Sequence, residues 1–558
     1  MKRMIFKQAS LLTLSSLLAV GSQHAEAQQV PGAGTLLQQN QPPRQPPVSS
    51  TDSGLTIEQT KDSALPASTP FQINRLEIEG NTQFDSLTLH ALVADVEGKS
   101  LTLEQLGEMT GRITAYYHNH GFPLARAIIP AQAIKSGIVH IRVVEASYGK
   151  IKLDNHSRVD ESLLRSTLSP LKSGEQIVQS TLDHSLLLLS DIPGIIPYAA
   201  LKPGEAVGTS DLEVQTTTNA GVTGNVSADN YGNHYIGTAR LGGVLNLLDP
   251  LHHGDVLSLN ALTTGSNMNY GGLTYDLLLN GYGTHMGTSY SAMHYTLGDN
   301  LSALDSHGNA DVTSLWLKHP FMRSPSVNVY GQLEYDYKNL KDIIGASNIE
   351  TNRHLNEVTA SLLGDWHDAS GVNRWGVSLM QGQVKFNNAA AQLADADTAK
   401  TQGSFNKWLA NLSREQFINQ GNSLYLALSG QWSNANLDAS EKMVAGGAYT
   451  VRGYDIGVLS GDHGMLGTIE WRHDLGQLAG GQTQGIVFFD SEHITINKAA
   501  WNQESNSANL SGAGVGLNWF SPIGLIIKAS IATPVGSKPN LLSTRGSARG
   551  WIDVGMAF

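Results

Sequence analysis

Hydrophobic and polar residues alternate along most of the chain after about residue 215. In residues 327–335, one face would carry Val, Val, Gly, Leu and Tyr, while the other carries Asn, Tyr, Gln and Glu. The same split recurs at 423–429, at 525–532 and in the final stretch that ends at Phe558. A period of two residues predicts β-strands with two unlike faces. The alternation fits a membrane barrel with apolar residues outside and also a soluble sandwich with apolar residues inside.

The N-terminus, the number of strands and the terminal Phe558 favour the membrane barrel. Basic residues at the start precede an apolar stretch at 11–20 and an Ala-Glu-Ala sequence at 25–27, which predicts a cleaved signal peptide at 1–27. No later segment has the roughly 18 to 20 consecutive apolar residues that a membrane helix needs. A mature chain that crosses a membrane would therefore form a closed barrel, and residues 215–558 suffice for roughly 16 strands of about 10 residues each.

Two stretches before the barrel have a mixed pattern that predicts compact α/β modules, at 70–145 and 146–214. The first has the order strand, helix, helix, strand, strand, at 75–79, 87–96, from 102 onward, 124–129 and 137–144. Thr102 and Gln105 form a capping box that starts the second helix. The second module has the same order, at 151–153, 160–165, 177–189, 195–201 and 209–214.

The segment from 28 to 69 is rich in Gln, Pro, Ser and Gly. Residues 30–39 can form a short helix, whereas the prolines of 42–47 predict an extended linker. Composition alone also allows the whole segment to be a disordered spacer.

Composition excludes several classes of function. The absence of cysteine excludes disulfides and Cys-ligated zinc, and a net charge of -12 gives no basic footprint for nucleic acid. His118 and His120 do not share a helix face, so we predict no metal site. The glycine run at 512–516 lacks the following helix of a phosphate loop, and we predict neither a cofactor nor an enzyme. An outer-membrane lipase or protease stays an alternative, because a catalytic triad is defined by geometry.

One arginine, Arg452, stands in a long loop of small residues at 436–455 that can fold back into a barrel. In the next hairpin Asp490 shares a strand face with Phe488, an unusual neighbourhood for a carboxylate without a partner. In a confined lumen a guanidinium gives a bidentate bond, whereas lysine gives only a point charge. The alternative is a solvated loop arginine with no such role.

Several motifs stand together in this chain: a Val-Arg-Gly-Tyr loop sequence, a Phe-x-Asp strand motif, a Pro-Gly-Ala-Gly stretch and a terminal aromatic residue, beside the two α/β modules. The residues concerned are Val451, Arg452, Gly453, Tyr454, Phe488, Asp490, Pro31, Gly32, Gly34, Leu36, Leu37 and Phe558. Together these motifs and the two POTRA-like modules resemble the TpsB family of two-partner-secretion transporters, a branch of the BamA superfamily. Further similar runs stand at 229–232, 248–255, 318–323 and 512–516.

The resemblance implies a mainly β fold, with a 16-stranded transmembrane β-barrel preceded by two periplasmic POTRA domains and a plug helix. The implied order is signal peptide 1–27, plug helix and linker 28–69, POTRA domains 70–145 and 146–214, and barrel 215–558. The plug would occupy the resting pore, Arg452 and Asp490 would lock the inward loop to the wall, and Phe558 would be the C-terminal barrel signal.

The implied function is export, without a chemical step, through the outer membrane of a Gram-negative bacterium. The POTRA domains would add an extended segment of a large TpsA-type exoprotein to an open strand edge. That partner would be an adhesin, a cytolysin or a contact-dependent toxin. Outer-membrane lipid, the barrel assembly machinery and periplasmic chaperones are further expected partners. A BamA-like insertase and a passive porin are the alternatives; the count of two modules argues against the first, and their presence against the second.

Overall fold

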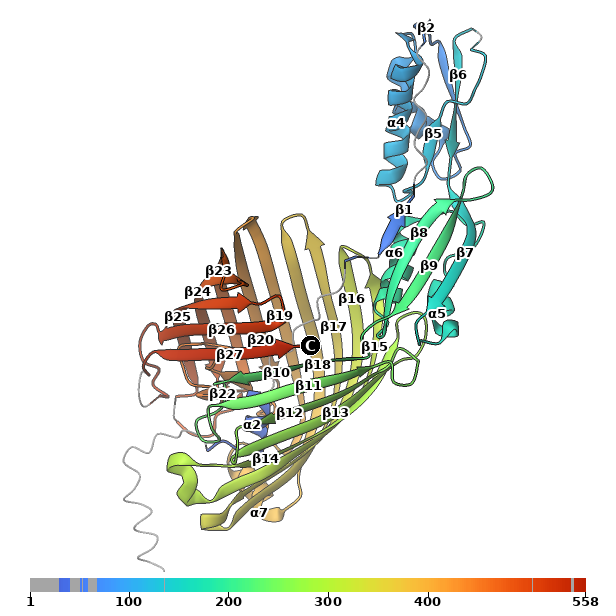
Figure 1. Cartoon of the computed structure of the whole chain (residues 1–558). Helices are drawn as coiled ribbons and strands as arrows, with labels where there is room; N and C mark the ends of the chain where they lie inside the picture. The colour runs from blue at the N-terminus through green and yellow to red at the C-terminus, as the bar shows by residue number, and fades with distance from the viewer. Residues whose placement is uncertain are drawn as a thin grey trace, which may run out of the picture.

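The computed structural model describes residues 30–40, 51–52, 54–58, 68–134, 136–503, 505–542 and 546–558. The signal peptide expected at 1–27 lies outside the described residues. Figure 1 shows a large barrel and, at one end of it, an arm of two small α/β modules. Among the described residues, no helix has the length and apolar character required to span a membrane.

Sixteen antiparallel strands form the closed barrel, which confirms the predicted fold and strand number. Pairing of the first strand with the last closes the ring. In order, the strands are β10 (Val222–Asp229), β11 (Arg240–Leu248), β12 (Val256–Thr263), β13 (Met268–Leu278), β14 (His285–Thr296), β15 (Ser306–Arg323), β16 (Val327–Ile344), β17 (Ile349–Asp368), β18 (Gly371–Phe386), β19 (Gly403–Asn419), β20 (Asn422–Ser433), β23 (His463–Leu478), β24 (Gly481–Thr495), β25 (Ser507–Phe520), β26 (Leu525–Pro534) and β27 (Arg549–Ala557).

The barrel turns its apolar face outward. On β16, Leu333 and Tyr335 are 54% and 42% exposed, while Glu334 and Asp336 between and beside them are 7% and 4% exposed. On the last stretch of chain, Ile552, Met556 and Phe558 are likewise exposed. A soluble sandwich would place these two sets the other way round. The arrangement therefore fits a barrel whose outer wall contacts lipid and whose lumen is polar.

The first module, residues 71–144, packs two helices against a sheet in the order β3-β6-β5. Its elements are β2 (Phe71–Gln72), β3 (Arg75–Glu79), α3 (Ser86–Ala91), η1 (Ala94–Val96), β4 (Ser100–Leu101), α4 (Leu103–Asn119), β5 (Arg126–Ile128) and β6 (Ile138–Val144). Helix α4 begins at the predicted capping box of Thr102 and Gln105. The single helix expected at 87–96 is two short pieces, because the amides of Leu92 and Val93 bond three residues back in a tight turn.

The second module, residues 147–218, has the sheet order β1-β8-β9-β7. Its elements are β7 (Ser147–His156), α5 (Glu161–Leu168), α6 (Gln179–Ser190), β8 (Ile195–Pro203) and β9 (Thr209–Thr218), and β1 (Leu55–Ile57) joins it from the N-terminal segment. Strand β9 runs past the boundary expected at residue 214. Thr216 is fully buried in the module and donates to Asn155 Oδ1 at 2.8 Å, so the barrel begins only at Val222.

The second module is docked on the barrel. Arg323 at the end of β15 makes two hydrogen bonds to Asp191 at the end of α6, at 2.6 and 2.8 Å. Leu278 of β13 belongs to the buried apolar cluster of the module, and the amide of Asp160, before α5, donates to the His252 carbonyl between β11 and β12. Both apolar and ionic contacts therefore hold the module at the barrel end.

Further short elements lie within the barrel or at its ends. Helix α2 (Ala33–Asn40) lies inside the barrel, whereas α7 (Ala389–Asp397) lies at the end away from the modules (Figure 1). The inward loop, residues 434–462 between β20 and β23, carries β21 (Met443–Ala445) and β22 (Leu459–Gly461). The 3-10 helices η2 (Asp299–Leu304) and η3 (Gly345–Ser347) lie in the connections on either side of β15 and β16.

Candidate functional site in the barrel lumen

The inward loop is packed into the barrel by apolar side chains near its tip. Val451 and Tyr454 are almost completely buried and belong to a cluster that includes Ile494 and Leu510 of the wall. Gly447 has a positive φ, and a Cβ there would lie 2.9 Å from the Ile456 side chain. Glycine therefore allows the loop to turn back on itself inside the lumen.

Arg452 makes a bidentate ion pair with Asp490 of β24. Its Nε and one terminal nitrogen donate to the two carboxylate oxygens at 2.8 and 2.7 Å, and its backbone amide also donates, at 3.2 Å. The other terminal nitrogen donates to Glu470 of β23 at 2.7 Å. The guanidinium carbon lies 3.4 Å from the centre of the Phe488 ring. The structure thus brings together the loop residue and both strand residues singled out in the sequence.

The loop tip approaches the wall closely at two glycines. A Cβ on Gly453 would lie 2.9 Å from Pro534 N, and a Cβ on Gly512 would lie 2.9 Å from Gly453 N. The Trp551 indole donates to the Arg452 carbonyl at 2.8 Å. Gly512, the first glycine of the run at 512–516, therefore makes room for the loop.

The base of the inward loop carries charged residues that the sequence analysis missed. Glu441 accepts from Lys338 of β16 and Lys407 of β19 at 2.5 and 2.7 Å. Asp438 pairs with Arg353 of β17 at 2.5 Å, and Lys442 pairs with Asp462 at 2.7 Å. The wall partners Lys338, Arg353 and Lys407 lie on the polar faces of their strands, which was a signal that they point inward. No local pattern in the sequence indicates which loop residue meets which wall residue.

The plug segment lies in the same lumen. Leu36 and Leu37 of α2 are buried against barrel side chains such as Tyr295 and Leu340. A Cβ on Gly34 would lie 2.6 Å from the backbone nitrogen of Ser440 in the inward loop, so this close approach requires glycine. The remaining residues of the predicted plug, Pro31 and Gly32, precede the helix; Pro31 is buried and Gly32 is only partly buried.

Hydrogen bonds at both ends of α2 connect it to the wall. The amide of Ala33 donates to Asp342 Oδ1 of β16 at 2.6 Å. At the other end, Gln39 accepts from Asn233 at 2.8 Å and Asn40 accepts from Arg240 at 3.2 Å. Helix α2 is therefore held in the lumen by hydrogen bonds in which its own groups are neutral.

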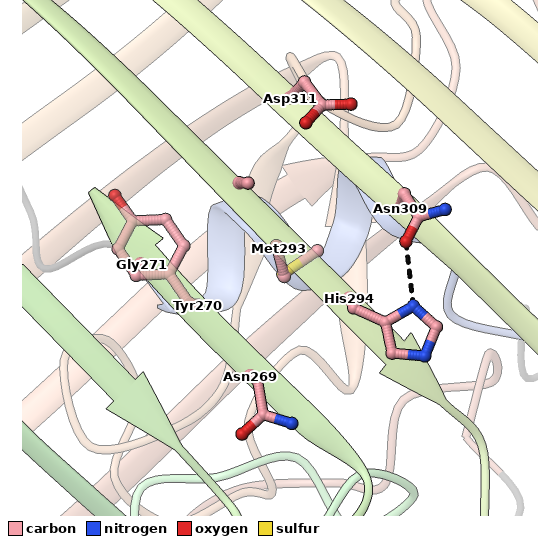
Figure 2. A pocket seen from close by; sticks show the side chains of 8 residues that line it. Asn269, Tyr270, Gly271, Met293, His294, Asn309 and Asp311 are labelled. Atoms are coloured by element: carbon pink, nitrogen blue, oxygen red, sulfur yellow. Dashed lines mark hydrogen bonds between the residues drawn. The ribbon is translucent and has the colours of Figure 1, made fainter. Parts of the chain in front are cut away.

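The described residues contain no group of three or more metal-binding side chains. His118 and His120 are hydrogen-bonded to backbone carbonyls of the first module, at 3.0 and 2.7 Å. A pocket at the barrel wall spans β13 to β15, where His294 and Asn309 are joined at 2.8 Å (Figure 2). The other labelled polar side chains, Asn269, Tyr270 and Asp311, stand apart and do not converge on one point.

The second module has a further candidate site, which is the β8 edge of its sheet. Strand β1 pairs in parallel with β8, with Thr56 opposite Ala200. The Ala199 amide donates to the Gly54 carbonyl at 3.1 Å, and the Glu58 amide donates to Leu201 at 2.9 Å. The expectation of an open edge is therefore wrong for β8, because the chain's own N-terminal segment covers it.

Comparison with known proteins places the chain in a family. A profile described as haemolysin secretion/activation protein ShlB/FhaC/HecB matches residues 208–519, more than half of the 558 residues. The chain belongs to this family. A ShlB-type POTRA profile matches residues 71–146 of this transporter, over the first module.

Two relatives and one solved structure extend over most of the transporter. It is 26% identical over 500 residues to the heme/hemopexin transporter protein HuxB of Haemophilus influenzae, with 88% of each chain covered. It is 23% identical over 464 residues to the outer membrane transporter CdiB of Escherichia coli, covering 81% of this chain and 76% of the relative. The solved structure of CdiB from Escherichia coli has a TM-score of 0.68 at 19% identity, covers 99% of this chain and 98% of that one, and shares its fold.

These findings confirm the function and location inferred from the sequence. The protein is a two-partner-secretion transporter of the outer membrane of a Gram-negative bacterium, with its modules in the periplasm. Its barrel exports a partner exoprotein. HuxB and CdiB are both named as transporters. BamA of Haemophilus ducreyi also resembles the chain, with a TM-score of 0.52 at 13% identity over 88% of this chain and all of that one, which shows a shared fold alone.

Proposed function

We propose that the partner exoprotein is captured as an extended strand at the β8 edge, in place of β1. The pairing of β1 with β8 carries this proposal, because it shows that the edge accepts a parallel strand. Main-chain hydrogen bonds supply the affinity of such strand addition and demand little of the added sequence. Strand β1 is then a competitor that the partner displaces.

Displacement of β1 would also act on the plug. Helix α2 ends at Asn40 and β1 begins at Leu55, so both belong to one N-terminal segment. The 14 residues between them can span at most about 50 Å. A partner that takes the place of β1 frees the periplasmic end of this tether, and α2 then leaves the lumen to open a path for export.

The residues singled out in the sequence take conformational roles in this scheme. Val451, Arg452, Gly453 and Tyr454 hold the inward loop against the wall strand that carries Phe488 and Asp490. The plug is formed around Gly34, Leu36 and Leu37. The pair of Arg452 and Asp490 is already fully engaged by hydrogen bonds, which supports a locking role without catalysis or a cofactor.

The partner is proposed to be a large TpsA-type exoprotein: an adhesin, a cytolysin or a contact-dependent toxin. The name of HuxB refers to heme and hemopexin, and that of CdiB only to outer-membrane transport. The proposed order of domains is a signal peptide at 1–27, a plug and linker at 28–69, the two POTRA domains and the barrel. Biogenesis is proposed to use the barrel assembly machinery, through the strand that ends at Phe558, and periplasmic chaperones.

Replacement of Thr56 by Pro tests the capture step. Proline has no amide hydrogen and disrupts a strand, so Thr56→Pro should release β1 from β8. If β1 covers the edge about 90% of the time, its release raises the apparent affinity for the partner's N-terminal region about tenfold. The measurement is the Kd of purified transporter in detergent for that region. Thr56→Val, which keeps the strand, is the control, and unchanged or weaker binding by Thr56→Pro would contradict capture at this edge.

A further inference from the structure

The two modules meet at Glu145, which lies between β6 and β7. One oxygen of its carboxylate accepts hydrogen bonds from the amides of Thr82 and Gln83 at 2.8 and 3.0 Å and from the Tyr117 hydroxyl at 2.7 Å. The other oxygen accepts from the Thr82 hydroxyl at 2.5 Å and from Gln176 Nε2 at 2.7 Å. A single side chain thus receives five hydrogen bonds.

The donors to this carboxylate come from both modules. Thr82 and Gln83 follow β3 and Tyr117 lies on α4, all in the first module, whereas Gln176 precedes α6 of the second module. Gln176 also donates to the Thr82 hydroxyl at 3.1 Å. Glu145 therefore ties a turn, a helix and the neighbouring module to one point of the chain.

Two further contacts join the modules beside Glu145. The amide of Gln179 donates to the carbonyl of Gly121 at 2.9 Å, and Leu124 packs against the apolar core of the second module. Both contacts involve the connection between α4 and β5. The relative orientation of the modules therefore depends on the carboxylate, its donors and this connection.

The environment keeps Glu145 ionised. Burial acts to raise its pKa, but the hydrogen bonds from Thr82, Gln83 and Tyr117 outweigh burial and hold the pKa below its usual value. The pKa of Tyr117 is raised by burial and by its bond to Glu145, so the phenol stays a donor. Hydrogen bonds to a charged acceptor are stronger than those between neutral groups.

We propose that Glu145 is a positioning residue that fixes the angle between the two modules, so that a partner held along the arm is aimed at the barrel mouth. The aiming step rests on the proposed capture at β8, whereas the fixed angle does not. The second module is already docked on the barrel through Arg323 and Asp191. Glu145 extends that fixed geometry to the first module.

The test is a distance measurement between spin labels on full-length transporter in detergent. The sequence contains no cysteine, so labelled pairs can be introduced without background. One pair spans the junction, at the exposed positions Glu108 and Lys172. A second pair, at Lys172 and Glu205, lies within the second module and reports whether that module stays folded.

Glu145→Gln should broaden the distance distribution across the junction and leave the distribution within the second module unchanged. Loss of the charged acceptor lowers the ratio of the fixed module orientation to all other orientations on the order of tenfold. Export should fall as that ratio falls. The matched control is Glu79→Gln, which removes a half-exposed ion pair with Arg142 and should change neither readout.

Exchange of the carboxylate at 145 and the amide at 176 should restore the fixed orientation of the modules. In the double variant Glu145→Gln/Gln176→Glu, an amide again faces a carboxylate across the junction, so the distribution should narrow toward that of the parent. An unchanged distribution in Glu145→Gln would overturn the positioning role, and so would normal export from a protein with a broadened junction. The distance measurement needs no partner, so failure of the capture proposal would leave it unaffected.

Discussion

The plug helix and the inward loop fill the same lumen but are held there by different forces. Helix α2 (AGTLLQQN) contains no charged residue and is held by apolar packing and by hydrogen bonds in which its own groups are uncharged. The inward loop places Asp438, Glu441, Lys442 and Arg452 in buried ion pairs. One segment is neutral, and the other is fixed by charge at both its base and its tip.

The two segments also differ in how many partners the carboxylates of the barrel wall would lose if the segment moved out. Without α2, Asp342 loses the Ala33 amide but keeps Arg353 at 2.8 Å and the Tyr295 hydroxyl at 2.6 Å. Without the loop, the fully buried Asp490 loses all three donors of Arg452. Asp490 keeps the Thr468 hydroxyl at 3.0 Å, but lumen water has to replace a bidentate charged contact, which is stronger than the neutral hydrogen bonds that α2 gives up. We therefore infer that the plug leaves during export and the loop stays.

Removal of the ion pair between Arg452 and Asp490 at the loop tip should have the largest effect on export. Arg452→Ala should sharply reduce export from a folded barrel, because Asp490 is left buried without its partner. Asp490→Ala should have a similar effect, and the double variant should be little worse than either single one, since the two groups act on one contact. Export is measured as secreted partner per folded transporter.

Two outcomes would remove the locking role of this pair. One is normal export by Arg452→Ala. The other is a double variant whose loss is the product of the two single losses. Arg414→Ala, at a partly exposed pair with Asp368 on the barrel wall, is the control and should export nearly as the parent does.

A milder change at the base of the loop should have a smaller effect. Glu441→Gln keeps the shape of the side chain but removes the charge that faces Lys338 and Lys407. Lys338 keeps Glu357 at 2.8 Å, so part of the network survives. We expect a destabilisation of about 1–3 kcal/mol and reduced export. The onset of heat modifiability on gels measures the first effect; a barrel as stable as the parent would contradict a role for the base charges.

Removal of the plug should affect export least. Deletion of residues 28–45 removes helix α2, which is uncharged and whose wall contacts are replaced by water or by neighbours, so secretion should continue. Single-channel conductance in planar bilayers should rise, because α2 no longer fills the lumen. Unchanged conductance would make the segment a spacer, as composition alone allowed.

The barrel was predictable from the sequence because face alternation is a local property. Leu333 and Glu334 differ in burial as the period of two requires, and the same is true around the wall. The capping box of Thr102 is equally local. Arg452 and Asp490 were found through their motifs and through an odd neighbourhood for a carboxylate.

The features that were missed depend on long-range contacts. Strand β1 has three residues in a polar, low-complexity segment and exists only because β8 offers it an edge. The partners of Glu441 lie 34 and 103 residues away, on β19 and β16. Glu145 follows a strand without any unusual local pattern. Each needs the folded chain to bring its partners together.

Thiol accessibility during export tests the central distinction between plug and loop most directly. Leu36 and Val451 are both 0% exposed in the same lumen, one on the plug and one on the loop. Single variants Leu36→Cys and Val451→Cys are treated with a membrane-impermeant maleimide, with and without active export of the partner. We predict that Cys at the plug position becomes labelled only during export, while Cys at the loop position stays protected. Equal labelling of both positions during export, or protection of both, would contradict the account.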